Sequence, residues 1–313
     1  MPAFATHYLF LEEMREALEK ACTFDLDEKV AGVGTQGPDI FIFHRLWPPV
    51  TIYKSLFGTA SKLHRGKPAD LFDAFAGYLK ISQNPHVARS YIYGFILHYA
   101  LDRNCHPYVY ARQNAITDAD PKIHPLAAHN RVEHGVDTYL LNRRKGIYPP
   151  SLFDPDATFT SDPAELAEIA ELMQCVIKVT CGKDVPQKEV VKAVTDTAKL
   201  QATLADKKGN AQKIAHAIET PLGPVSGYFK LSASIKPTDL TLAADCANEQ
   251  KAEWTSPYSG ETSTESFEEL FEKSKPDALA LLTGFDALCE GKTTAYDVTG
   301  NLSFLTGMEV TDE

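Results

Sequence analysis

The chain has 313 residues, 44% of them hydrophobic, so it can bury the core of one large domain or two ordinary ones. Its net charge of −11, from 42 acidic and 31 basic residues, argues against a general binder of duplex DNA or anionic membranes, because both need a basic face. Catalysis on phosphate esters is not excluded, since bound metal ions would reverse the local field.

Cysteine usage and the N-terminal segment indicate the compartment. The six cysteines form no CxxC pair and no dense framework, which is typical of reduced thiols. The segment MPAFATHYLFLEEMREALEK lacks the regions of a signal peptide and predicts an amphipathic helix instead. No stretch reaches the length of a membrane span. We therefore expect a soluble, cytoplasmic protein without a transmembrane segment.

Helical periodicity dominates the sequence, and the predicted fold class is all-α. The predicted helices span residues 8–21, 68–82, 86–105, 125–143, 163–180, 186–205, 209–218 and 266–290. Asp162 before Pro163 is a start signal, and Ser266 with Glu269 forms a capping box. Pro276 is expected to kink or break the last helix. The strand prediction is limited to a short hairpin around residues 225–240.

Two irregular regions separate the helices. Residues 32–58 contain too much Gly and Pro for a continuous helix, and because long loops often carry function, Asp39 and His44 are candidates there. Residues 219–262 either wall a pocket or pack on the surface. We expect a metal-binding helical core over residues 1–155, with a helical C-terminal part over residues 156–313 packed on it as one domain.

Residues 94–106, GFILHYALDRNCH, place His98, Asp102 and His106 four residues apart along one predicted helix. Four residues advance a helix by about 400°, so these side chains share a face and drift only about 40° per step. His129 and Glu133 repeat the spacing in HNRVEHGVD. Two such faces turned toward each other would form a cage of imidazoles and carboxylates, which suits hard or borderline metal ions.

The segment SYIYGFILHYAL around His98 is apolar almost all round, which predicts a central, buried helix. A buried Asp102 therefore needs a cation or strong hydrogen bonds. The structural alternative is a satisfied core histidine, with Asp102 paired to Arg103 or another base. His7, Asp39 and His64 bring the ligand-type side chains to eight, which exceeds one tetrahedral ion and suits two or three ions sharing a carboxylate.

This order of residues resembles the zinc-dependent phospholipase C family, which also includes the S1/P1-type single-strand nucleases. The motifs that carry the resemblance, within roughly residues 1–145, are THYLF, GTQGPDIF, LHRG, GFILHYALDRNCHPY and HNRVEHGVDTYL. The resemblance implies a multi-helical fold and a trinuclear zinc site, in which Asp39 is also the general base. The implied ligands are Asp39, His64, His98 and Asp102 for the first ion, Asp102 and His7 for the second, and His106, His129 and Glu133 for the third.

One departure from the family concerns the second ion. Secreted members begin, after signal cleavage, with a tryptophan whose amine and carbonyl complete that site, whereas this chain begins Met-Pro-Ala-Phe. The ion is then weakly held, held by a substitute such as His44, or absent. Asp137 either orients a histidine or is a solvated helix charge. The histidines without ligand spacing are expected to be structural or surface residues; they are His86, His124, His134 and His216.

We interpret the chain as a zinc-dependent hydrolase of phosphate esters, a phospholipase C-like phosphodiesterase that uses a metal-bridging hydroxide. The expected substrate is a small phosphate ester or phospholipid headgroup. Two alternatives stay open: a nuclease-like phosphodiesterase on single-stranded nucleic acid, and a non-catalytic metal-stabilised binding protein. Stacking platforms for the nuclease would be Trp47, Tyr53, Trp254 or Tyr258. We expect two or three zinc ions per chain, although iron, nickel or manganese also suit these ligands.

Overall fold

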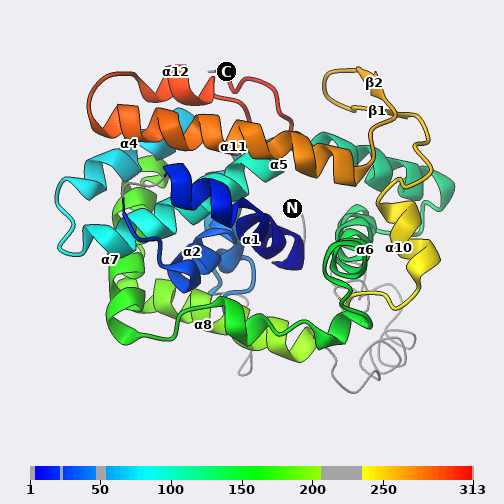
Figure 1. The fold of residues 1–313 in the computed structure, drawn as a ribbon, viewed down its shortest axis with the longest axis horizontal. Coiled ribbons are helices and arrows are strands. Elements are labelled where there is room, and N and C mark those ends of the chain that lie inside the picture. The colour runs from blue at the N-terminus through cyan, green and yellow to red at the C-terminus, as the bar shows by residue number, and fades with distance from the viewer. Residues whose placement is uncertain (1–3, 22–23, 47–53, 206–234, 312–313) are drawn as a thin grey trace.

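The computed structural model describes residues 4–21, 24–46, 54–205 and 235–311, and it confirms the all-α class (Figure 1). The helices before residue 150 are α1 (Phe4–Ala21), α2 (Glu28–Gly34), η1 (Gly37–Phe41), α3 (Phe57–Arg65), α4 (Pro68–Leu79), α5 (Pro85–Ala119) and α6 (Pro125–Lys145). The later elements are η3 (Pro150–Leu152), η4 (Pro155–Thr158), α7 (Pro163–Cys181), α8 (Gln187–Leu204), α10 (Leu240–Cys246), β1 (Trp254–Thr255), β2 (Thr262–Ser263), α11 (Phe267–Cys289) and α12 (Ala295–Thr299). None of the helices in the described ranges combines the length and apolar character that a membrane span needs.

Helix α5 lies at the centre of the fold. It packs against α1, α2, α4, α6, α7 and α11, and every residue from Tyr91 to Asp102 is buried. Figure 1 shows α11 running alongside it. The apolar segment SYIYGFILHYAL therefore finds a packing partner on all sides, which is why its sequence shows no polar face.

The predicted start signals act as expected. The Asp162 side chain accepts hydrogen bonds from two backbone N–H groups of the first turn of α7. Ser266 and Glu269 form both hydrogen bonds of a capping box at the start of α11. These caps satisfy backbone donors that the first turn of a helix leaves without partners.

Two long helices continue through a proline. Helix α5 contains Pro107, so the predicted end at residue 105 is wrong, and α11 contains Pro276 without the break that was one of the two expected outcomes there. A proline inside a helix costs about 3 kcal/mol because it removes a hydrogen bond and clashes with the preceding turn. The extensive packing between these two helices outweighs that local cost.

The interval 32–58 contains no continuous helix in its described residues, as the sequence predicted, but α2, η1 and α3 were not anticipated as helices. Glycines on α2 and α5 let these two helices cross with the backbone of one helix in contact with that of the other. A Cβ at Gly94 would lie 2.1 Å from the carbonyl oxygen of Ala31, and one at Gly34 would lie 2.2 Å from that of Tyr91. Only glycine fits this crossing, which places the turn after α2 against the buried face of α5.

The C-terminal part packs on the same helical core. One hydrophobic cluster contains residues from both parts, and the ring of Phe304 lies 4.6 Å from that of Tyr99 on α5. The division at residue 155 stays a prediction. The small β1–β2 hairpin and helices α10 and α12 were not predicted. The predicted helix 209–218, with His216, and most of the predicted hairpin 225–240 lie outside the described residues.

Candidate metal centre

The eight residues predicted as ligands lie together in the interior, and none of these residues is more than 8% exposed. They form three groups in which the candidate ligand atoms lie within 4.8 Å of one another, and the first two groups share His98. The groups are His7, Asp39 and His98; His64, His98 and Asp102; and His106, His129 and Glu133. The structure thus brings together every residue that the sequence analysis named as a ligand, from segments up to 126 positions apart (His7 to Glu133).

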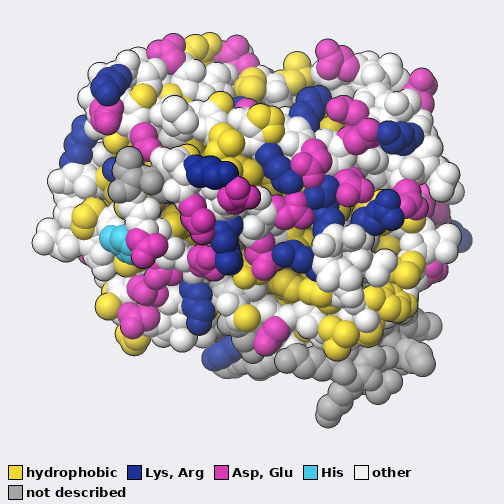
Figure 2. Space-filling model, viewed as in Figure 1, with side chains coloured by type: hydrophobic (Ala, Val, Ile, Leu, Met, Phe, Trp, Pro, Cys, Tyr) yellow, Lys and Arg dark blue, Asp and Glu magenta, His cyan; other side chains and the backbone are white. Residues whose placement is uncertain are grey.

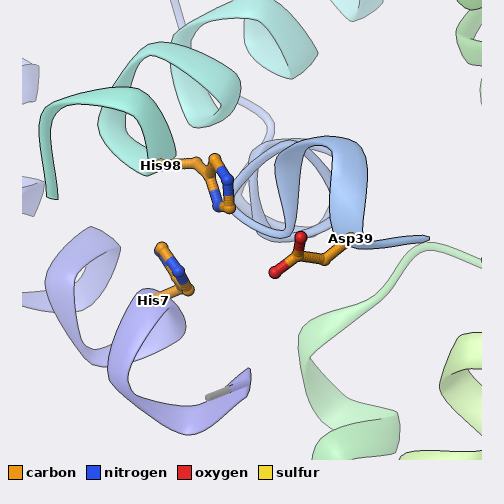
Figure 3. Close-up of side chains that lie close together, drawn as sticks. All are labelled: His7, Asp39 and His98. Carbon is orange, nitrogen blue, oxygen red and sulfur yellow. The ribbon is translucent and has the colours of Figure 1, made fainter. Parts of the chain in front are cut away.

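Five helical segments supply these residues. The four-residue spacing puts His98, Asp102 and His106 on one face of α5, and His129 and Glu133 on one face of α6. His64 comes from α3. Figure 3 shows His7 of α1 and Asp39 of η1 turned toward the same space as His98.

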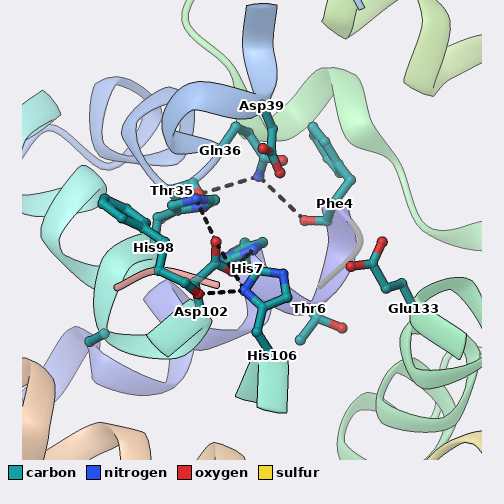
Figure 4. Close-up of polar contacts among 12 residues, drawn as sticks. Phe4, Thr6, His7, Thr35, Gln36, Asp39, His98, Asp102, His106 and Glu133 are labelled. Atoms are coloured by element: carbon teal, nitrogen blue, oxygen red, sulfur yellow. Dashed lines mark hydrogen bonds and ion pairs between the residues drawn. The ribbon is translucent and has the colours of Figure 1, made fainter. Parts of the chain in front are cut away.

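Asp102 lies between several histidines (Figure 4). Its Oδ1 is 3.4 Å from Nε2 of His7, and its Oδ2 is 3.1 Å from Nε2 of His98. Two ligands of a tetrahedral zinc ion with bonds of about 2.05 Å lie about 3.3 Å apart. Each observed separation therefore fits a pair of side chains that would hold one ion between them.

The other acids lie at similar distances from imidazoles. Asp39 Oδ1 is 3.2 Å from Nε2 of His64, and Glu133 Oε1 is 2.9 Å from Nε2 of His129. Gln36, in the turn between α2 and η1, donates a hydrogen bond of 3.4 Å to the carbonyl oxygen of Phe4 in α1. This contact holds the segment that carries Asp39 beside the helix that carries a ligand imidazole.

The close contacts around Asp102 are not hydrogen bonds. Within the described part of the chain, both Asp102 oxygens and Nε2 of His7, His64, His98 and His106 are buried without a hydrogen-bond partner. Buried polar atoms in folded proteins normally have partners, because leaving one without a partner costs about 1–3 kcal/mol. Imidazole nitrogens and carboxylate oxygens are the donors that zinc binds, so the residues present fit that metal.

The second ring nitrogen of four of these histidines faces an oxygen. The Nδ1 contacts are His64 to Ala60 O at 2.9 Å, His98 to Thr35 O at 3.0 Å, His106 to Phe304 O at 2.7 Å and His129 to Gln113 Oε1 at 3.0 Å. An Nδ1–H group that donates to these oxygens leaves the lone pair on Nε2, directed into the cluster. Histidines that bind metals generally have such a partner.

Sequence reasoning missed all four of these acceptors. Three are backbone carbonyls, which no residue type marks. Gln113 lies seven residues after His106, which is about two helical turns, so it is on the same face of α5. Extending the helical spacing by two turns would have identified it as a partner of His129.

Burial and charge shift the pKa values of the cluster. Burial lowers the pKa of His7 and lowers that of His106 to about 3, while it raises the pKa of Glu133. Burial also raises the pKa of Asp102, but the charges of His98 and His106 outweigh this and hold the pKa well below its ordinary value. Burial thus favours the neutral form of His7 and His106, which is the form that binds a metal, whereas the charge of Asp102 outweighs burial at His98 and raises its pKa.

His44 is not available as a substitute ligand, so that suggestion is wrong. Its Nε2 lies 3.0 Å from Oε2 of Glu189, and its Nδ1 accepts a hydrogen bond of 3.0 Å from the N–H of Leu56. Both ring nitrogens are engaged outside the cluster. Residues 1–3 lie outside the described ranges, so the departure at the terminus stays a prediction.

Asp137 has a role that neither interpretation anticipated. It is fully buried and accepts hydrogen bonds from the N–H groups of Ala5 and Thr6, at 3.2 and 2.8 Å, and from the Thr6 hydroxyl. Its Oδ2 also lies 3.3 Å from Nζ of Lys236. A negative charge at a helix N-terminus is stabilising. Asp137 therefore anchors the first turn of α1, directly before His7.

The remaining sequence candidates lie outside the three groups. His86 contacts the carbonyl oxygen of Asp25, His124 caps α6, and His134 is buried, so these histidines are structural as expected. Trp254 packs edge-on against Tyr108, which favours packing over a role as a stacking platform. Trp47 and Tyr53 lie outside the described residues.

The family model for zinc-dependent phospholipase C matches residues 6–202, which is more than half of the chain. The chain belongs to this family. The matched region extends past the expected residues 1–145 and includes all eight ligand-type residues. No curated protein and no solved structure matches the chain. Membership of the zinc-dependent phospholipase C family confirms the predicted resemblance, and it favours zinc as the metal of this site.

Proposed function

We propose that this chain is a zinc-dependent hydrolase of phosphate esters, acting on a small phosphodiester in the manner of a phospholipase C. The observation that carries the proposal is the cluster of buried imidazoles and carboxylates in which Asp102 Oδ2 lies 3.1 Å from His98 of one group and 3.7 Å from His106 of another. A structural zinc site needs four ligands, whereas eight ligand-type side chains offer more than one ion can use.

In this proposal the ligands divide as the family resemblance implies. The residues that would hold the ions are Asp39, His64, His98 and Asp102 for the first, Asp102 and His7 for the second, and His106, His129 and Glu133 for the third. Zinc bound there supplies a Lewis acid for the phosphoryl oxygens and lowers the pKa of water toward neutrality. The acidic side chains balance part of the positive charge, which leaves the site attractive to an anionic ester.

Asp39 is the proposed proton acceptor. Its Oδ1 has no hydrogen-bond partner among the described residues, and its side chain keeps 8% exposure, whereas that of Asp102 is fully buried. Water can therefore approach Asp39 more readily than the central carboxylate. A carboxylate within hydrogen-bond reach of the attacking water can take its proton while the water oxygen bonds to phosphorus and the bond from phosphorus to the leaving ester oxygen breaks.

Hydrolysis of bis(p-nitrophenyl) phosphate tests the proposal. Turnover should disappear when the chain is treated with EDTA and return when zinc is added. Asp39→Asn should lower kcat by about 100-fold or more, as expected for loss of a general base. Asp73→Asn, at an exposed position of α4, is the matched control and should leave kcat unchanged. A lower melting temperature after chelation, without zinc-dependent turnover of any ester, would identify a metal-stabilised binding protein instead.

A further inference from the structure

A second pocket lies between helices α5 and α6, apart from the metal centre. It is open to solvent and has a volume of about 450 Å³, which falls in the range typical of small-molecule sites. Its walls include Arg112, Ile116 and Ala119 of α5, Asp120 and Ile123 of the connection that follows, and Arg131 of α6.

The pocket and the metal centre use different faces of the helices. Each residue advances an α-helix by about 100°, so Arg131 lies about 200° around α6 from His129 and from Glu133. No described residue that lines the pocket belongs to the three groups of candidate ligands. A molecule bound in this pocket would therefore leave the metal centre free.

Arg131 brings a positive charge to the pocket. Its side chain is exposed and makes no ion pair or hydrogen bond with any residue that the structure describes. Its backbone carbonyl oxygen lies 3.6 Å from Sγ of Cys246, which places this turn of α6 beside α10. The whole guanidinium of Arg131 is thus available to a ligand.

Arg112 supplies a second guanidinium whose orientation is fixed. Its Nη2 donates hydrogen bonds to Oδ2 and to the carbonyl oxygen of Asp245, at 2.6 and 3.2 Å. Its Nη1 has no partner within the described part of the chain. Burial raises the pKa of the Cys246 thiol to about 11, and the charges of Arg131 and Arg112 both oppose this rise. The two guanidiniums therefore lie near the same thiol, at one side of the pocket.

The acidic side chains here favour a ligand with a single negative charge. Asp245 is paired with Arg112, and Oδ1 of Asp120 accepts a hydrogen bond of 3.0 Å from the N–H of Lys122. These contacts leave the donors of Arg131 and Nη1 of Arg112 for one anionic group. The two carboxylates would repel a second negative charge, as on a phosphate monoester.

The rest of the pocket is apolar. Ile116 packs against the hydrophobic core, so this wall of the pocket is held in place, and Ala119 and Ile123 continue the apolar surface. A hydrocarbon chain that leaves water for this surface is stabilised by the hydrophobic effect. Donors on one side and an apolar wall on the other suit an amphiphilic anion.

We propose that this pocket binds a small monocarboxylate that carries a short alkyl chain. Its carboxylate lies between Arg131 and Nη1 of Arg112, and its chain lies along Ile116 and Ile123. The planar guanidinium presents parallel N–H donors that match the two oxygens of a carboxylate. This binding is separate from the hydrolysis proposed for the metal centre and does not depend on it.

Calorimetric titration of the zinc-loaded chain with sodium hexanoate tests the inference. Hexanoate should bind roughly tenfold more tightly than acetate, because its chain covers the apolar wall. Arg131→Gln should weaken hexanoate binding about tenfold without changing Tm, since Arg131 has no partner among the described residues to lose. Arg143→Gln, at an exposed position near the other end of α6, is the control and should leave the affinity unchanged. Ile123→Ser should reduce the preference for hexanoate over acetate.

Carboxylates also bind zinc, so the titration is repeated after treatment with EDTA. Binding that survives Arg131→Gln and disappears with the zinc would place hexanoate at the metal centre and overturn the inference. Equal affinities for hexanoate and acetate, or tighter binding of hexylammonium than of hexanoate, would also overturn it. Because none of these measurements involves turnover of an ester, the pocket and the proposed hydrolase stand or fail separately.

Discussion

Replacing Asp102 with Asn should remove more than one zinc ion per chain. The substitution keeps the volume of the side chain but exchanges one carboxylate oxygen for an NH2 group and removes the negative charge. In the structure Oδ1 faces His7 and Oδ2 faces His98, at 3.4 and 3.1 Å. An asparagine can offer an oxygen in only one of these directions, and it offers no charge in either.

The size of the effect follows from linkage between binding and folding. An ion present at 1,000 times its dissociation constant stabilises the folded chain by about 4 kcal/mol, so the loss of two ions removes about 8 kcal/mol. For a domain of this size 1 kcal/mol corresponds to roughly 2 °C in Tm, so the zinc-dependent part of Tm should fall by on the order of 15 °C.

Elemental analysis after zinc loading and dialysis measures the ions per chain, and thermal unfolding with and without zinc measures the shift in Tm. His134→Gln is the control, because His134 neighbours the ligand Glu133 but lies outside the three groups, and it should leave the metal content unchanged. Loss of one ion or fewer on Asp102→Asn would refute a carboxylate shared between two ions.

Three further predictions concern the same centre. Gln113→Leu removes the acceptor of the Nδ1 proton of His129 and should weaken zinc binding by about 10- to 100-fold in a competition with a chelator; an unchanged affinity would rule out this orienting role. Gly37→Ala should lower both the metal content and the free energy of unfolding, because Gly37 has φ +49° and a Cβ there would lie 2.3 Å from the His98 ring. The control Gly58→Ala has open space around its Cβ and should change neither quantity. Elemental analysis of the purified chain should find zinc at two or three ions per chain, and a value below one would contradict a polynuclear site.

The ligand cluster was largely predictable because the spacings that identify most of its residues lie within single helices. The spacing of His98, Asp102 and His106 identifies one face of α5, and the apolar residues between them identify a helix buried on every side. Together, these two patterns predict that the polar side chains on this face form a buried cluster. The spacing of His129 and Glu133 does the same for α6.

Other features depend on tertiary packing that local patterns do not record. Pro107 predicts an end to α5, yet the helix continues because its neighbours stabilise it on several sides. His44 lies in a loop beside candidate ligands, and only the fold shows that Glu189, 145 positions away, binds it. The role of Asp137 likewise depends on α1 and α6 lying side by side, which the spacing within either helix does not determine.

The contact between His106 and Phe304 makes the orientation of a proposed metal ligand depend on a residue that is translated late. The carbonyl oxygen that orients this imidazole comes 198 positions later in the chain. A ribosome must therefore translate residue 304 and release it from the exit tunnel before the third group of ligands is fully oriented. Zinc acquired during synthesis would meet an incomplete site, so complete loading should follow translation.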